Sequence, residues 1–294
     1  MTSVTLLDGG MGQELVHRAP EPPTGLWGTQ VMIDHPGLVA EVHRDYFNAG
    51  ASIATTNSYA MHHDRFTGTP QEGRQRVLIE LASAEAEAAR TDHGSGRIAG
   101  SIGPLIWSYA PQAHPDYATA LALYAEIAQV LAPRVDLILC ETVASIDHAR
   151  AVLDGARATD RPVWLSVTVD DEDGSLLRSG EPVADLADLA PDAWLANCSA
   201  PEAMGAALDV FANWGLPFGA YANGFEEITK AYLDPSSTVD KLAARRDMGP
   251  VAYAKIVLGW IDHGATIVGG CCEIGPAHIR EIAHQLSKAG HDIV

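Results

Sequence analysis

Short runs of β-branched and other apolar residues alternate with longer amphipathic stretches along the whole 294-residue chain. This alternation is typical of repeated strand–helix units, whose strands pair in parallel. The clearest helical stretch places apolar residues on one face, at Tyr117, Leu121, Tyr124, Ala128 and Leu131. The pattern predicts eight strands, at residues 4–7, 52–55, 97–101, 135–140, 163–169, 193–197, 218–221 and 266–268.

Eight strands that alternate with eight helices suit a closed barrel better than an open doubly wound sheet. The sequence also has no GxGxxG or GxxxxGK[ST] phosphate loop to support the open alternative. We therefore expect an α/β fold, a single (β/α)8 TIM barrel, with residues 1–294 as one domain. Pro36, Pro201 and Pro276 lie where first helical residues are expected, and Gly50 lies where a helix is expected to end.

The formal net charge of −19 argues against several kinds of partner. Nucleic acids and anionic membranes both require concentrated Lys and Arg, so we expect neither to bind. An acidic surface can attract a cationic small molecule, although general solubility is the commoner reason for such a charge. The N-terminus resembles no secretory signal, and no apolar stretch approaches the ~20 residues that span a bilayer. We therefore expect a cytoplasmic protein, whose oligomeric state the sequence does not indicate.

Four cysteines in a chain of this length do not form a disulfide scaffold. Two glycines precede the adjacent Cys271 and Cys272 at the end of the last predicted strand, and Cys198 directly follows the sixth. Adjacent strand residues point to opposite faces, but glycine permits an irregular backbone that turns both sulfurs inward. Three such thiolates would leave one open position, as in catalytic zinc sites. Burial as apolar filler remains the alternative, and it is the role expected of Cys140.

Two acidic residues come at the ends of predicted strands, Asp8 after the first and Glu141 after the fourth. At the rim of a barrel, such a carboxylate can hold a substrate ammonium, or it can instead accept hydrogen bonds from backbone amides. Gly9 and Gly10 continue from Asp8, and we expect their backbone N–H groups to be free to bind a substrate carboxylate.

Two long connections, 9–35 and 222–250, follow predicted strands on the side where barrel active sites are built. Lids or binding loops are therefore expected there, with ordinary decoration as the alternative. The run His62-His63-Asp64 is expected in a solvated loop, because no HExxH or HxH pattern supports a metal site. The second connection carries aromatic and acidic residues that suit a cationic ligand, namely Phe225, Glu226, Glu227, Tyr232 and Asp234.

Eight motifs occur along nearly the whole chain, at 6–15 (LLDGGMGQEL), 49–59 (AGASIATTNSY), 100–104 (GSIGP), 139–142 (LCET), 197–199 (NCS), 221–224 (YANG), 268–272 (VGGCC) and 275–279 (GPAHI). In sequence and in order these motifs resemble the homocysteine S-methyltransferase family. The NC and GGCC motifs together are highly specific to that family, and the others are moderately specific.

The resemblance implies a zinc-containing (β/α)8 barrel, a methyltransferase that converts homocysteine to methionine. It implies that Cys198, Cys271 and Cys272 hold the zinc, which activates the substrate thiol as its thiolate. It also implies that Asp8 and Glu141 help to hold the amino-acid substrate. The asparagine that matches Asn223 can lie at or near the fourth zinc position.

Two departures from the family pattern lie close to these residues. Many members follow the paired cysteines with Gly-Thr or Gly-Ser, where this chain has Glu273 and Ile274. The strand 7 motif often reads Tyr-Pro-Asn, and here Ala222 replaces the proline. Neither change affects an implied zinc ligand, but the carboxylate of Glu273 beside the metal can alter the substrate pocket.

The methyl donor is inferred from the length of the chain. Methylfolate and corrinoid enzymes generally carry further domains, and 294 residues leave no room for them after a full barrel. A sulfonium donor, S-methylmethionine or S-adenosylmethionine, then fits best, with a betaine donor or a different thiol acceptor as alternatives. Two other classes also remain, a non-catalytic zinc- or thiol-binding barrel and a redox protein with a Cys271–Cys272 disulfide.

Overall fold

The computed structural model describes residues 2–228, 232 and 238–294. Its strands are β1 (Ser3–Leu6), β2 (Ile53–Thr55), β3 (Arg97–Ile102), β4 (Leu137–Val143), β5 (Val163–Val167), β6 (Ala193–Asn197), β7 (Phe218–Tyr221), β8 (Ile267–Val268) and β9 (Asp292–Ile293). They pair in parallel in the order β2-β3-β4-β5-β6-β7-β8-β1-β9. A parallel bridge between Leu7 and Ile53 joins the end of β1 to β2, which closes the ring. The expected TIM barrel is therefore confirmed.

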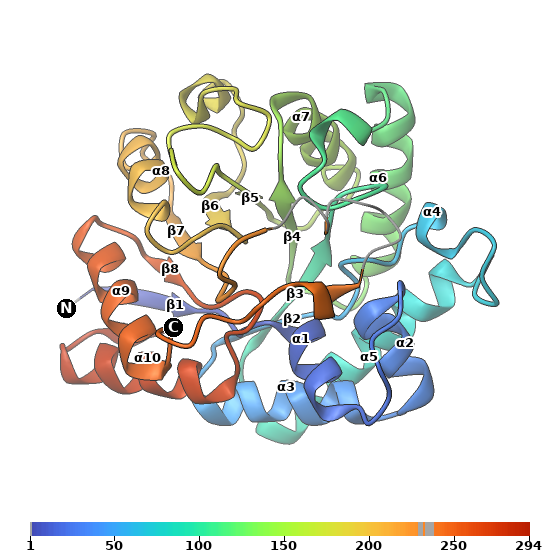
Figure 1. The fold of residues 1–294 in the computed structure, drawn as a ribbon, viewed down its shortest axis with the longest axis horizontal. Helices are drawn as coiled ribbons and strands as arrows, with labels where there is room; N and C mark the ends of the chain where they lie inside the picture. The colour runs from blue at the N-terminus through green and yellow to red at the C-terminus, as the bar shows by residue number, and fades with distance from the viewer. Residues whose placement is uncertain (1, 229–231, 233–237) are drawn as a thin grey trace.

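Helices connect the strands and surround the barrel (Figure 1). No helix in the described part of the chain is long and apolar enough to cross a membrane. The helices are α1 (Met11–Arg18), α2 (Trp27–Asp34), α3 (Leu38–Ala49), α4 (His63–Phe66), α5 (Gln75–His93), α6 (Tyr117–Leu131), α7 (Ile146–Ala156), α8 (Met204–Phe211), α9 (Pro250–Asp262) and α10 (Pro276–Lys288).

The predicted helix boundaries are partly confirmed. Pro276 opens α10, and Gly50, with a φ of 109°, caps α3. The prediction was wrong for Pro36 and Pro201, because α3 and α8 begin two and three residues later. Each of these prolines lies instead in a turn that precedes its helix.

All eight predicted strands are present, but their ends differ from the prediction. β4 runs on to Val143, with an irregular register after Cys140, so Glu141 lies within the strand rather than after it. β5 ends at Val167, two residues earlier than predicted. The additional strand β9 pairs with β1 at the opposite edge from the β1–β8 contact.

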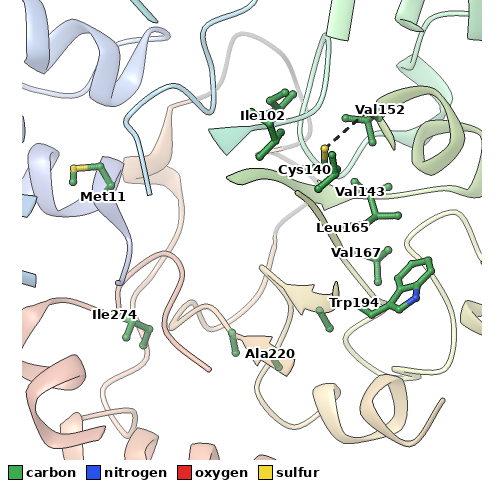
Figure 2. Close-up of a cluster of buried hydrophobic side chains, with 14 of the residues drawn as sticks. Met11, Ile102, Cys140, Val143, Val152, Leu165, Val167, Trp194, Ala220 and Ile274 are labelled. Atoms are coloured by element: carbon green, nitrogen blue, oxygen red, sulfur yellow. Dashed lines mark hydrogen bonds between the residues drawn. The ribbon is translucent and has the colours of Figure 1, made fainter. Parts of the chain in front are cut away.

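Strand periodicity decides which side chains of β4 face the inside of the barrel. Leu137 and Leu139 pack with apolar residues from the other strands, in a cluster to which no helix contributes. Glu141 shares their face and therefore points into the barrel mouth. Cys140 faces outward, with its Sγ 3.9 Å from the Val152 carbonyl oxygen of α7 (Figure 2). Cys140 is thus a buried core residue, as its position within a strand predicts.

Candidate functional site

A deep pocket opens where the strands of the barrel end. It encloses about 1080 Å³, including its open mouth. Residues from the carboxyl ends of seven strands line it, among them Asp8, Thr55, Ser101, Glu141 and Cys271. This is the face on which TIM barrels place their active sites.

Three cysteines meet in this pocket. The sulfur atoms of Cys198, Cys271 and Cys272 all lie within 4.8 Å of one another, and those of Cys198 and Cys271 are 2.7 Å apart. Within the described residues, they are the one group of His, Cys, Asp or Glu side chains close enough to hold a metal ion together. The structure therefore brings together the three residues predicted as ligands and leaves Cys140 in the core.

The backbone after β8 turns both adjacent thiols to the same side. β8 ends at Val268, and the following loop is held by hydrogen bonds to two neighbouring strand ends. Gly270 N donates to Asp8 O at 3.0 Å, and Cys271 N donates to Ala222 O at 2.9 Å. Because this segment is no longer a strand, successive side chains need not alternate between faces. The irregular backbone expected at the two glycines is present.

Cys198 is positioned by a network that the sequence did not single out. It has a φ of 54°, which is uncommon for a residue with a side chain. The buried amide of Asn197 accepts from Thr142 N at 2.8 Å and from Ser166 Oγ at 2.9 Å, and it donates to Thr142 Oγ1 at 3.0 Å. A buried polar residue at a strand end is the signal that might have identified Asn197.

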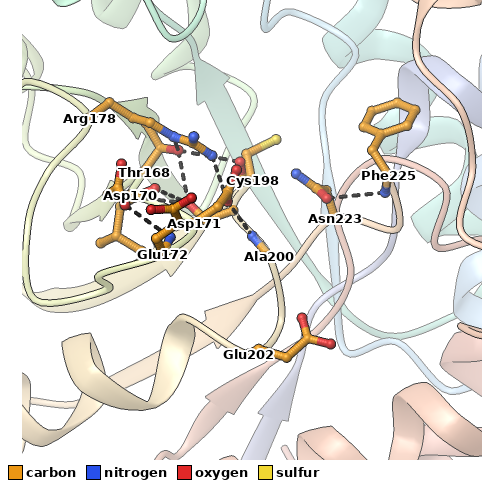
Figure 3. Close-up of polar contacts among 12 residues, drawn as sticks. Thr168, Asp170, Asp171, Glu172, Arg178, Cys198, Ala200, Glu202, Asn223 and Phe225 are labelled. Atoms are coloured by element: carbon orange, nitrogen blue, oxygen red, sulfur yellow. Dashed lines mark hydrogen bonds and ion pairs between the residues drawn. The ribbon is translucent and has the colours of Figure 1, made fainter. Parts of the chain in front are cut away.

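The loop after β5 supports the backbone around Cys198 from the other side (Figure 3). Thr168 Oγ1 donates to the carbonyl oxygen of Cys198 at 3.3 Å. Asp171 Oδ1 accepts from Ala200 N at 2.7 Å and from Arg178 Nη2 at 2.8 Å. These contacts fix the chain on both sides of the cysteine, which keeps its thiol in the pocket.

The three thiols influence one another electrostatically. The pKa of Cys198 is held well below its usual value because Cys271 and Cys272 donate hydrogen bonds to its sulfur. The pKa values of Cys271 and Cys272 are raised, first because each stays protonated beside the Cys198 thiolate, and also by burial. One thiolate therefore forms readily, while the second and third need a positive charge to accompany them.

Two buried carboxylates lie in the same pocket. Asp8 accepts from Thr55 N at 2.7 Å and from Thr55 Oγ1 at 2.8 Å. Glu141 accepts from Ser101 Oγ and, at 3.0 Å, from Tyr221 OH. Burial raises the pKa of Asp8 to about 8, with a further contribution from the negative charge of Glu141. Burial likewise raises the pKa of Glu141 to about 7. Both groups would be stabilised as anions by a cationic ligand.

Gly9 and Gly10 allow the turn after β1 to pack closely against the cysteine loop. A Cβ on Gly9 would lie 1.9 Å from the carbonyl oxygen of Ile274, and one on Gly10 would lie 2.6 Å from that of Cys271. The N–H of Gly10 donates to the Ile274 carbonyl oxygen at 3.0 Å. The expectation of a free amide is therefore wrong for Gly10, because the turn after β1 packs directly against the cysteine loop.

We expect Gly9→Ala to lower metal binding at the cysteines and to destabilise the fold by about 1–3 kcal/mol, because a backbone oxygen must move to make room. Gly205→Ala is the matched control, since its Cβ on α8 meets open space. Metal titration and chemical denaturation of both variants measure the effects. Equal metal affinity in the two variants would contradict the packing role of Gly9.

Aromatic side chains form one wall of the pocket. Trp27 and Tyr59 meet edge to face, with ring centroids 6.0 Å apart. Phe225 and Tyr232 of the second long connection also line the pocket, as expected for a binding loop. Of the other residues predicted in that loop, Glu226 and Glu227 are exposed, and Asp234 lies outside the described residues.

Two further residues that the sequence singled out lie near the cysteines. The Asn223 side chain is buried between Cys198 and Phe225, where its Oδ1 accepts from Phe225 N at 3.1 Å (Figure 3). The Glu273 carboxylate turns to α1 and accepts from Gln13 Nε2 at 2.5 Å and from His17 Nε2 at 3.2 Å. The altered residue after the cysteines thus contacts a helix and does not extend the thiol cluster.

The expectation of a solvated loop at the paired histidines is wrong for His62. This residue is 1% exposed and packs edge to face against Tyr124 of α6, with centroids 6.3 Å apart. His63 is exposed as expected, and its Nε2 lies 3.0 Å from a carboxylate oxygen of Glu126. The packing of α4 against α6 buries the first histidine and leaves the second at the surface.

Comparisons with known proteins identify the family of this chain. The sequence profile of the homocysteine S-methyltransferase family matches residues 5–286. Homocysteine S-methyltransferase YbgG of Bacillus subtilis is 27% identical over 95% of this chain and 93% of its own length. Homocysteine S-methyltransferase of Escherichia coli is 29% identical over 95% of this chain and 94% of its own.

Among solved structures, the metallated form of homocysteine methyltransferase MmuM from Escherichia coli is similar, with a TM-score of 0.80 and 26% identity. The likeness covers 97% of this chain and 96% of that one. The profile, the relatives and the fold agree over nearly the whole length. The chain therefore belongs to the homocysteine S-methyltransferase family and is a methyltransferase.

Proposed function

We propose that this chain transfers a methyl group from a sulfonium donor, S-methylmethionine or S-adenosylmethionine, to the thiol of homocysteine, which yields methionine. Cys198, Cys271 and Cys272 hold one Zn²⁺ ion for this reaction. The observation that carries the proposal is the convergence of three thiols beside two buried carboxylates in one pocket. A thiol cluster and a pair of carboxylates match the two ends of an amino acid that carries a thiol.

The chemistry of the donor set supports zinc. Thiolates are soft ligands that select zinc over magnesium or calcium, and three protein ligands leave one position for a substrate sulfur. The pKa values of Cys271 and Cys272 are raised because their thiolates would lie beside the Cys198 thiolate. A divalent cation offsets the repulsion between these negative charges and so favours loss of the second and third protons. Bound zinc would supply a deprotonated and oriented substrate thiol at neutral pH.

The carboxylates are suited to hold the ammonium of homocysteine. Thr55 donates to Asp8, while Ser101 and Tyr221 donate to Glu141, and these contacts fix the orientation of the carboxylate oxygens. Burial disfavours the charged forms of Asp8 and Glu141 in the free pocket because water does not hydrate them well. An ammonium that enters the pocket therefore forms a strong charge-assisted hydrogen bond with these carboxylates. Substrate bound in this way keeps its sulfur directed to the cysteines.

The aromatic wall is suited to the donor. A sulfonium cation is attracted to the faces of Trp and Tyr rings, and Trp27, Tyr59, Tyr109 and Tyr232 line this pocket. The leaving sulfide departs neutral, so no acid is needed to protonate it. As part of the same proposal, residues 1–294 act as one domain in the cytoplasm, where reducing conditions keep the thiols free.

The test measures bound zinc per chain together with methyl transfer to homocysteine from S-methylmethionine, S-adenosylmethionine, betaine and methyltetrahydrofolate. We expect about one zinc per chain, turnover with a sulfonium donor, loss of turnover on chelation, and recovery when zinc is restored. Turnover with betaine or methyltetrahydrofolate alone would assign a different donor. Zinc binding without methylation would indicate a binding protein, and metal-free thiol–disulfide chemistry would indicate a redox protein.

A further inference from the structure

Arg65 brings a positive charge to the pocket of a strongly acidic protein. It lies in α4 and is the one Lys or Arg among the described residues that line the pocket. It also lines an adjoining hollow with Thr24, Gly25 and Trp107, which contains neither the cysteines nor the two buried carboxylates. Arg65 therefore lies toward the mouth, away from the acceptor's proposed contacts.

The guanidinium of Arg65 packs on an aromatic ring and forms no ion pair with the residues that the structure describes. It lies over the Trp107 ring, with its central carbon 4.2 Å from the ring centroid. Its Nε is buried without a hydrogen-bond partner, and no ion pair of Arg65 occurs in the part of the chain that the structure describes. The neighbouring Asp64 carboxylate lines the same hollow and attracts Arg65 electrostatically, but it forms no ion pair with Arg65 and accepts a hydrogen bond from Ile106 N at 2.9 Å. A half-buried guanidinium that forms no ion pair among the described residues, and whose buried Nε has no hydrogen-bond partner, keeps N–H donors that an anionic ligand can satisfy.

A chain of aromatic rings connects this cation to the thiol cluster. Tyr109 packs with Cys198 and Cys272. The ring of Tyr232 lies 6.3 Å from that of Tyr109 and 5.8 Å from that of Trp107, over which Arg65 is stacked. A donor whose onium group lies against this wall, close to the thiols, can thus extend a second group toward Arg65.

We propose that Arg65 binds the carboxylate of the methyl donor, so that the pocket selects onium donors that carry a carboxylate. The inference rests on the proposed function, because it assumes that the donor lies along the aromatic wall. A guanidinium forms two parallel hydrogen bonds to a carboxylate, and it does so most strongly where water is scarce. The acidic residues Asp8 and Glu141 remain free to hold the ammonium of the acceptor.

The experiment compares S-methylmethionine with its carboxamide, which has the same sulfonium but no carboxylate. Binding of each to the zinc-loaded protein is measured by calorimetry, and turnover is measured separately. We expect the wild type to bind the carboxylate form about 10- to 100-fold more tightly. Arg65→Met keeps the packing on Trp107 and should abolish this preference, while Arg65→Lys should restore part of it. Affinity for the carboxamide and the KM for homocysteine should not change.

Arg74→Met is the matched control, because Arg74 is exposed and lies outside both hollows. An equal loss of affinity for both donors in Arg65→Met, or a preference that survives the substitution, would show a purely structural role and overturn the inference. In that case turnover with S-methylmethionine would still support the proposed function. If neither sulfonium binds or reacts, the proposed donor is wrong and the inference falls with it.

Discussion

Replacing any one of Cys198, Cys271 and Cys272 by alanine is expected to lower methyl transfer by more than about 100-fold and to remove most of the bound metal. The three sulfurs lie within 4.8 Å of one another, so each substitution removes one of only three protein ligands. Mutation of a group that only orients a metal ligand typically lowers metal affinity or activity about 10- to 100-fold. Loss of a ligand itself should have a larger effect. Metal content and kcat/KM measured on the same preparations give both effects.

Cys140→Ala is the matched control for this series. Its sulfur faces α7 and touches the carbonyl oxygen of Val152, outside the pocket. We expect a loss of stability of about 1 kcal/mol and unchanged metal content. If the pocket variants kept their metal and activity, or if Cys140→Ala lost metal as they do, the assignment of the three ligands would be wrong.

Asp8→Asn and Glu141→Gln are expected to raise the KM for homocysteine about 10- to 150-fold, while the metal stays bound. Each substitution replaces a buried anion, held by donors from the barrel, with a neutral amide that attracts an ammonium far less. Steady-state kinetics at saturating donor measures the change. The analogue 4-mercaptobutanoate, which has the thiol but no ammonium, is the control substrate and should react equally with wild type and variants.

The pH dependence of the same KM follows from the raised pKa values. In the free pocket, the carboxyl groups lose their protons only near pH 7 for Glu141 and pH 8 for Asp8. Binding of an ammonium requires their anions, so the KM should rise as the pH falls from 8 to 6. Deprotonation of the substrate thiol also contributes to the dependence of the KM on pH. The difference in this dependence between wild type and Asp8→Asn therefore gives the contribution of the Asp8 carboxylate. Identical slopes would mean that Asp8 does not hold the ammonium.

The fold is largely readable from the sequence because strand and helix patterns are local. All eight predicted strands are present, and the barrel follows from their regular alternation with helices. The residues at which the strands end are less predictable. β4 continues through Glu141 because pairing with β5 resumes at Val143 after an irregular register. Such pairing depends on a neighbouring strand and is invisible in the periodicity of one segment.

The candidate site is readable in part. The cysteines and carboxylates at strand ends were predicted because parallel strands place their carboxyl ends on one rim. Asn197, whose amide braces the turn before Cys198, was not predicted because its role depends on partners in two other strands. The amide of Gly10 was expected to be free, but the cysteine loop packs against it and uses it.

The sequence by itself determined the alternation that builds the barrel and the chemical types present, three soft thiols and two carboxylates at strand ends. Only the tertiary structure decided which of them meet. Cys198 and Cys271 are 73 residues apart and meet because β6 and β8 pair on either side of β7. Arg65 follows β2 and lies over Trp107, which follows the neighbouring strand β3. Local patterns depend on neighbours along the chain, whereas a site depends on groups that only the pairing of strands distant in sequence brings within a few ångströms.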